Sequence, residues 1–184
     1  MRIAVIADIH GNYQALEAVL EDIDSLQITR IFSLGDNVGY GPEPDKVVNT
    51  LIDREIESVL GNHELALFDK RYLKRLNFIT RDSLALTRHN LSADNLEWLR
   101  KLKSFQVIHG ARMVHGCPPD SVTKYLFDPG GRRLNTIFNS YKEQLCFAGH
   151  THSLDCFRRQ STGDLTRLIL DGTPIRLEGP DRYI

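Results

Sequence analysis

Near its start the chain reads Ile3-Ala4-Val5-Ile6-Ala7-Asp8-Ile9-His10, and this segment decides the fold. Five consecutive apolar residues are typical of a strand buried on both faces, as in a parallel sheet. The next residues place Leu16, Val19, Leu20 and Ile23 at helical spacing, which predicts an amphipathic helix that covers the sheet. We therefore expect a strand and then a helix, the first half of a βαβ unit.

The same pattern returns twice along the chain. Strands are predicted over residues 30–34 and 56–60, with a helix over residues 42–54 between them. These strands end in Gly35-Asp36 and Gly61-Asn62, at the roughly 30-residue spacing of βαβ units. Because the carboxyl ends of parallel strands meet at one edge of a sheet, we expect the polar residues after all three strands to lie together.

The second half of the chain changes from helices to strands. Two helices are predicted between residues 76 and 102, and a further helix over residues 132–141. Hairpins are predicted over residues 105–115 and 154–170, with a strand over residues 144–148. No internal repeat or interdomain linker interrupts the pattern, so the sequence predicts a single α/β domain.

Composition limits the function classes. The chain has 184 residues, with 23 Lys+Arg, 24 Asp+Glu and a formal net charge of −1. This charge argues against capture of a nucleic acid or an anionic membrane surface by bulk electrostatics, although local basic patches stay open. Three cysteines fit a reducing compartment, and the apolar run near the start is too short for a signal or a membrane span. We expect a cytoplasmic protein and leave its oligomeric state, homo-oligomer included, open.

Five short polar segments each follow a strand-like run. Their carboxylates, amide and imidazoles suit Mn, Fe, Zn or Co, and the lack of thiolates argues against a closed structural zinc site. Seven donors are too many for one ion, whereas two ions that share a carboxylate would use them all. In extended D-x-H and H-x-H segments, alternate side chains project to the same side, toward the ions. The segments are Asp8-Ile9-His10, Gly35-Asp36-Asn37, Gly61-Asn62-His63-Glu64, Val114-His115-Gly116 and Gly149-His150-Thr151-His152.

The motifs D-x-H, G-D, G-N-H-E, H-G and G-H-T-H, in this order, resemble the calcineurin-like metallophosphoesterase superfamily over nearly the whole chain. The resemblance implies the calcineurin-like metallophosphoesterase fold, a two-sheet β sandwich flanked by α-helices. Residues 35–44 are similar to small prokaryotic phosphoesterases, including relatives of diadenosine polyphosphate hydrolases. They differ from protein Ser/Thr phosphatases, whose G-D-x-x-D-R-G motif has an acid and a phosphate-binding arginine where this chain has Gly39 and Tyr40.

The resemblance implies two divalent metal ions held by seven side chains. Manganese is the expected metal, and Fe, Zn, Co or Ni are alternatives. Val114-His115-Gly116 resembles the histidine-glycine turn of the family, so we prefer His115 over His109 as the ligand that follows a strand. The implied ligands are Asp8, His10 and His152 for the first ion, Asn62, His115 and His150 for the second, and Asp36 for both.

The resemblance also implies a reaction. A metal-bridging hydroxide would hydrolyse a small phosphodiester, phosphomonoester or dinucleoside polyphosphate. His63 corresponds to the catalytic imidazole and, as a cation, would donate a proton or a hydrogen bond to the leaving-group oxygen. Glu64 would orient His63 or support its loop.

Two other function classes stay open on the sequence alone. One is a non-catalytic metal-binding scaffold or regulatory protein with the same fold. The other is a nuclease, which the balanced charge disfavours.

Related chains continue past the equivalent of Arg182-Tyr183-Ile184 with a further turn and one or more strands. We therefore expect a single metallophosphoesterase domain over residues 1–184. Its carboxyl end is expected to be naturally short or truncated, and its second sheet to lack an edge strand.

Overall fold

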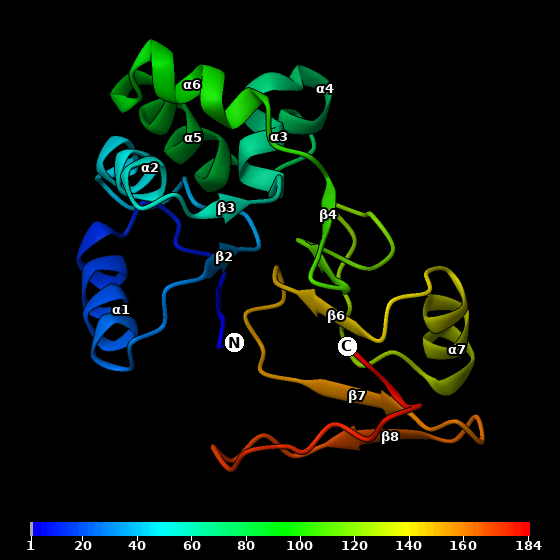
Figure 1. Ribbon diagram of the computed structural model, residues 1–184. Helices are drawn as coiled ribbons and strands as arrows, with labels where there is room; N and C mark the ends of the chain where they lie inside the picture. Colours follow the sequence, from blue (N-terminus) through cyan, green and yellow to red (C-terminus); the bar gives the residue numbers. More distant parts are fainter. Residues whose placement is uncertain (1) are drawn as a thin grey trace.

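The computed structural model describes residues 2–184 and contains two β-sheets with helices packed around them (Figure 1). The first sheet has three parallel strands in the order β1-β2-β3. Its strands are β1 (Ala4–Ile6), β2 (Ile31–Ser33) and β3 (Glu57–Ser58). The parallel sheet expected from the repeated strand-helix pattern is therefore confirmed.

The second sheet has six strands in the order β4-β5-β6-β9-β7-β8. Strands β5, β6 and β9 run parallel to one another, and the other pairs are antiparallel. Both predicted hairpins are present, as β4-β5 and β7-β8. The strands are β4 (Phe105–Ile108), β5 (Ala111–Val114), β6 (Leu145–Ala148), β7 (Cys156–Arg159), β8 (Leu165–Leu168) and β9 (Arg182–Tyr183).

Seven helices are present in residues 2–184, and most lie beside the first sheet (Figure 1). Polar caps start several of them: the Asn12 side chain accepts from the Ala15 N–H, and Ser92 accepts from the Asn95 N–H. None of these helices combines the length and the apolar character needed to cross a membrane. They are α1 (Tyr13–Ser25), α2 (Pro44–Asp53), α3 (Asn62–Phe68), α4 (Lys70–Leu73), α5 (Phe78–Asn90), α6 (Ala93–Arg100) and α7 (Gly131–Asn139).

A shared apolar core joins the two sheets. Phe32 and Val59 lie in and beside the first sheet and pack in one cluster with Ala111 and Met113 of β5, all of them buried. Other clusters fill the spaces beneath α1 and α2, beneath α3, α5 and α6, and between α7 and the second sheet. The expected two-sheet sandwich flanked by helices is confirmed.

Strand β1 differs from its sequence prediction, because its residues are half-buried rather than buried on both faces. The strand lies at the edge of a three-stranded sheet, so only β2 pairs with it. A cavity of about 700 Å³ adjoins it, lined by Val5 and Ala7 on this side and by Leu145 and Phe147 of β6 on the other. The apolar run predicted the strand correctly, but it carried no information on how far the sheet extends past β1.

Phe138 gives a test of the core around α7. Its side chain is fully buried, so truncation to alanine should leave a cavity and lower the free energy of unfolding by about 3–5 kcal/mol in urea denaturation. Phe78 is 65% exposed, and Phe78→Ala should change the free energy of unfolding by less than about 0.5 kcal/mol. Equal effects of the two substitutions would contradict this packing.

Candidate metal centre

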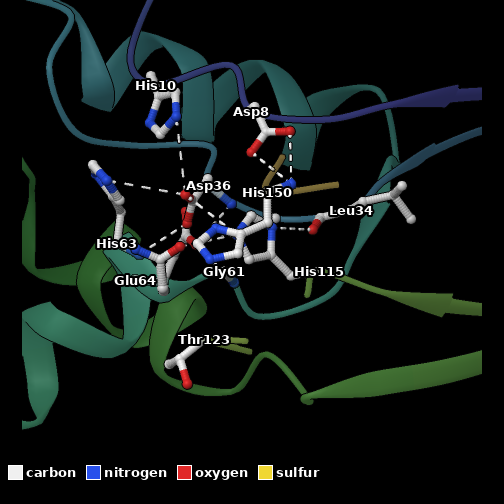
Figure 2. A network of polar contacts seen from close by, with 12 residues as sticks. Asp8, His10, Leu34, Asp36, Gly61, His63, Glu64, His115, Thr123 and His150 are labelled. Atoms are coloured by element: carbon white, nitrogen blue, oxygen red, sulfur yellow. Dashed lines mark hydrogen bonds and ion pairs between the residues drawn. The ribbon is translucent and has the colours of Figure 1, made fainter. Parts of the chain in front are cut away.

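The five polar segments converge at the carboxyl ends of β1, β2, β3, β5 and β6 (Figure 2). The structure brings together all seven donors predicted from the sequence, with His63 beside them. His109, the alternative to His115, lies instead in the exposed turn between β4 and β5. The strand order of the two sheets thus produces the predicted cluster.

Asp8, His10 and His152 form the first group of donors. The Nε2 atoms of His10 and His152 are 3.2 Å apart, and His152 Nε2 lies 3.5 Å from Asp8 Oδ1. The His152 side chain is 57% exposed, so this group faces the open side of the centre. The group therefore offers two nitrogens and one carboxylate oxygen that are accessible from solvent.

His115 is the middle of the second group. Its Nε2 atom is 3.1 Å from Asn62 Oδ1 and 3.1 Å from His150 Nδ1. Its Nδ1 atom lies 2.8 Å from the carbonyl oxygen of Leu34, which accepts the Nδ1–H and leaves Nε2 as the ring nitrogen that faces the cluster. His115 is completely buried, so its ring is fixed by packing as well as by this hydrogen bond.

The buried Asp36 carboxylate lies between the two groups. Its Oδ2 atom is 3.3 Å from His115 Nε2 in the second group and 3.9 Å from His10 Nε2 in the first. The same oxygen is 4.0 Å from His63 Nε2 (Figure 2). Asp36 is the side chain that both groups share, as the expectation of a bridging ligand requires.

The spacing of the donors fits divalent ions. Two donor atoms that each lie about 2.1 Å from one ion are about 3 Å apart in octahedral coordination. Five neighbouring donor pairs are 3.1–3.5 Å apart, close to this spacing, and Asp36 Oδ2 is 3.9 Å from His10 Nε2. Oxygen and nitrogen donors without a thiolate also match Mn, Fe, Zn or Co. The residues present therefore fit a pair of divalent cations.

Backbone conformation aims the ligands, and here the sequence argument was wrong. Asp8 and His10 were expected to face inward from an extended segment, but their φ angles are 54° and 53°. Asp36, His150 and His152 are also left-handed, with φ of 51°, 69° and 53°. Non-glycine residues rarely adopt this conformation, and it costs free energy that the surrounding structure must offset. The centre is thus built from tight left-handed turns rather than from alternating extended residues.

Glu64 connects the loops that carry Asp36 and Asn62. Its Oε1 atom accepts from the backbone N–H groups of Asn37 and Val38, at 2.7 and 3.2 Å. Its Oε2 atom accepts from those of Asp36 and Gly61, at 3.0 and 2.9 Å. The loops are so close that a Cβ atom at Gly61 would lie 2.1 Å from the Asp36 backbone nitrogen. Glu64 therefore supports the loops rather than orienting the His63 ring.

Electrostatics favour a positive charge at His115 and a neutral ring at His150. Burial alone would lower the pKa of His115, but the Asp36 carboxylate outweighs it and raises the pKa to about 9. Burial alone would raise the pKa of Asp36, but His115, His63 and His10 hold it below the usual range. Burial lowers the pKa of His150 to about 4. A bound metal would replace the proton that the carboxylate draws onto His115.

His63 differs from the expected imidazolium. Burial lowers its pKa to about 4, so the ring is neutral at pH 7 in this structure. Its Nδ1 atom is buried without a hydrogen-bond partner in residues 2–184 and lies 2.1 Å from the position of a Cβ at Gly39. Only glycine leaves room for the ring there, which explains Gly39 at this position. The ring is held in place by packing.

Sequence reasoning missed two tyrosines that contact the centre. The Tyr40 ring packs edge-on against His10 and His63, with centroid distances of 5.0 and 4.7 Å. Its hydroxyl is 3.0 Å from Thr80 Oγ1 in α5, which ties the centre to that helix. Tyr125 stacks on His150. Tyr40 follows a recognised motif and could have been found, whereas Tyr125 lies in a loop that no motif marks.

Comparison with known proteins agrees with the geometry. The chain is 36% identical over 155 residues to the uncharacterized protein MJ0912 of Methanocaldococcus jannaschii, a match that covers 82% of this chain and 62% of that protein. It is 35% identical over 124 residues to a symmetrical bis(5'-nucleosyl)-tetraphosphatase of Delftia acidovorans, which covers 62% of this chain and 44% of that enzyme.

A solved structure supports the same assignment. The crystal structure of a metallophosphoesterase from Sphaerobacter thermophilus superposes with a TM-score of 0.69 at 34% identity, over 86% of this chain and 62% of that chain. The chain spans less than two thirds of the length of each of these three proteins. A family model described as calcineurin-like phosphoesterase matches residues 1–154. The chain therefore belongs to the calcineurin-like phosphoesterase family.

Proposed function

We propose that this chain is a metal-dependent phosphoesterase that hydrolyses a small phosphodiester, phosphomonoester or dinucleoside polyphosphate. The observation that carries the proposal is the position of Asp36, whose Oδ2 atom lies 3.3 Å from one group of donors and 3.9 Å from the other. A carboxylate shared by two adjacent cation sites is the arrangement that in-line displacement at phosphorus uses. Family membership and the phosphatase relative support the same reaction.

The seven donors would hold two divalent ions, with manganese as the proposed metal. Asp8, His10 and His152 would hold the more accessible ion, and Asp36 would contact both. The ions, when bound, supply Lewis acidity toward the phosphoryl oxygens and lower the pKa of a coordinated water. The ligands of the buried ion would be Asn62, His115 and His150, together with Asp36.

His63 would act on the leaving group. Its Nε2 atom faces the centre 4.0 Å from Asp36 Oδ2, and its ring packs against His10 and Tyr40. A neutral imidazole with a proton on Nε2 can donate a hydrogen bond to an oxygen of the substrate. The negative charge of a bound phosphate raises the pKa of a neighbouring imidazole, so a proton can then be available for the departing oxygen.

Substitution of His63 tests the catalytic proposal. With Mn²⁺ added, His63→Ala should lower kcat for bis(p-nitrophenyl) phosphate by about 10²- to 10⁴-fold, the usual contribution of a general acid. His109→Ala is the matched control, because His109 is exposed in the β4-β5 turn and should leave kcat unchanged. Absence of turnover in the unsubstituted protein with every divalent ion tried would favour the scaffold alternative.

Substitution of Glu64 tests how the ligands are held. In Glu64→Gln an amide NH₂ replaces an oxygen that accepts backbone N–H groups, so the loops of Asp36 and Asn62 should separate. We expect the affinity for Mn²⁺, measured by calorimetry, to fall by about 10- to 100-fold. Glu21→Gln, at an exposed position of α1, is the matched control and should bind Mn²⁺ normally. Unchanged affinity in Glu64→Gln would show that Glu64 does not position the ligands.

A further inference from the structure

Three aromatic rings form a stack that starts at the candidate metal centre and ends in solvent. The Tyr125 ring lies on the His150 ring, with a centroid distance of 3.7 Å and an interplanar angle of 16°. The Phe127 ring lies on Tyr125 at 4.8 Å and 9°. Tyr125 is 47% exposed and Phe127 is 52% exposed. The stack is thus a continuous aromatic wall beside the centre.

The loop that carries these rings is held firmly. Leu126, between them, is buried in the core beneath α7, so both neighbouring rings project outward. The Arg133 guanidinium of α7 donates to the carbonyl oxygen of Tyr125 at 2.6 Å. The Cys117 N–H donates to the carbonyl oxygen of Lys124 at 2.7 Å, which closes the base of the loop. The backbone on both sides of the Tyr125 ring is therefore held by contacts with α7 and Cys117.

Close packing at Gly116 fixes the loop further. A Cβ atom there would lie 2.7 Å from the Ser121 carbonyl oxygen and 2.8 Å from that of Lys124. The Gly116 N–H also donates to the Ser121 carbonyl oxygen at 2.9 Å. Because Gly116 follows the candidate ligand His115, the loop and the metal centre share one rigid connection. A preorganised surface of this kind loses little entropy when it binds a ligand.

Aromatic rings, and not basic side chains, contact the donors of the centre in residues 2–184. No arginine or lysine in the described part of the chain hydrogen-bonds or ion-pairs with the seven donors or with His63. Aromatic rings border it instead, with Tyr40 beside His10 and the Tyr125-Phe127 pair beside His150. Stacking is therefore a source of binding energy that the centre offers away from phosphorus.

We propose that Tyr125 and Phe127 form an aromatic subsite that stacks a nucleobase of the substrate, a proposal that rests on the phosphoesterase function proposed above. The Tyr125 ring stacks with two rings, those of His150 and Phe127, whereas Phe127 stacks with Tyr125 alone and is half exposed. A planar base is the ligand group that this free face fits, since base-aromatic stacking needs no hydrogen bonds and tolerates every base.

The length of the stack also selects the kind of substrate. His150 and Tyr125 lie between the centre and the free face of Phe127. A ring bonded directly to the reacting phosphate is too close to the centre to reach that face. A nucleobase that is linked to the reacting phosphate through its sugar and further phosphates can reach that face. The proposal therefore favours nucleotides and dinucleoside polyphosphates over simple aryl phosphates.

A binding comparison tests the subsite without turnover. Calorimetry with the Mn²⁺-loaded protein would compare ATP with inorganic triphosphate, which carries the same chain of phosphates and lacks the nucleoside. We expect ATP to bind at least about fivefold tighter, the smaller end of base-aromatic stacking. Phe127→Ala should abolish this preference and Phe127→Trp should keep it. Phe78→Ala, which removes another exposed aromatic ring, should also keep it.

The two proposals fail in different ways. If the unsubstituted protein binds ATP and inorganic triphosphate equally, or if Phe127→Ala keeps the preference for ATP, the aromatic subsite is wrong. Hydrolysis of bis(p-nitrophenyl) phosphate in the same preparation would then show that the phosphoesterase function still holds. A preference for ATP that is lost only in Phe127→Ala supports the subsite, whether or not that aryl ester is hydrolysed.

Discussion

Two carboxylates, Asp36 and Glu64, are buried next to each other, and the rest of the centre depends on how each is satisfied. Glu64 receives four backbone N–H groups from the loops after β2 and β3. Asp36 Oδ1 accepts from the backbone N–H of His63 at 2.8 Å. Asp36 Oδ2 faces the imidazoles of His10, His63 and His115. A buried charge is costly unless an opposite charge lies close to it. Cations near Asp36 are therefore stabilising, and Glu64 holds the Asp36 loop in position.

The fold brings the donors together because the carboxyl ends of strands from the two sheets lie next to each other. Donors separated by more than 140 residues in the sequence, such as Asp8 and His150, become hydrogen-bonded neighbours. Left-handed conformations at five of the seven donors turn the side chains inward. Their cost is offset by packing such as the close approach of Gly61 to Asp36. Five of the ten non-glycine residues with positive φ in residues 2–184 are thus donors of the centre.

Much of this could be predicted from the sequence, because apolar runs followed by polar motifs mark where parallel strands end. The parallel order of β1, β2 and β3, both hairpins and the grouping of the donors follow from such local signals. Pairings between distant segments leave no comparable signal: β9 inserts between β6 and β7, and β1 lies beside a cavity. The neutral state of His63 comes from burial, and the Tyr125-Phe127 stack from a loop without a motif.

The most direct test of this account is anomalous diffraction at the manganese absorption edge from crystals soaked in Mn²⁺. The account predicts two peaks, one among Asp8, His10 and His152 and the other among Asn62, His115 and His150. The Asp36 carboxylate should contact both. A single peak, or no peak among these side chains at saturating Mn²⁺, would contradict the claim that the chain builds a two-metal centre around Asp36.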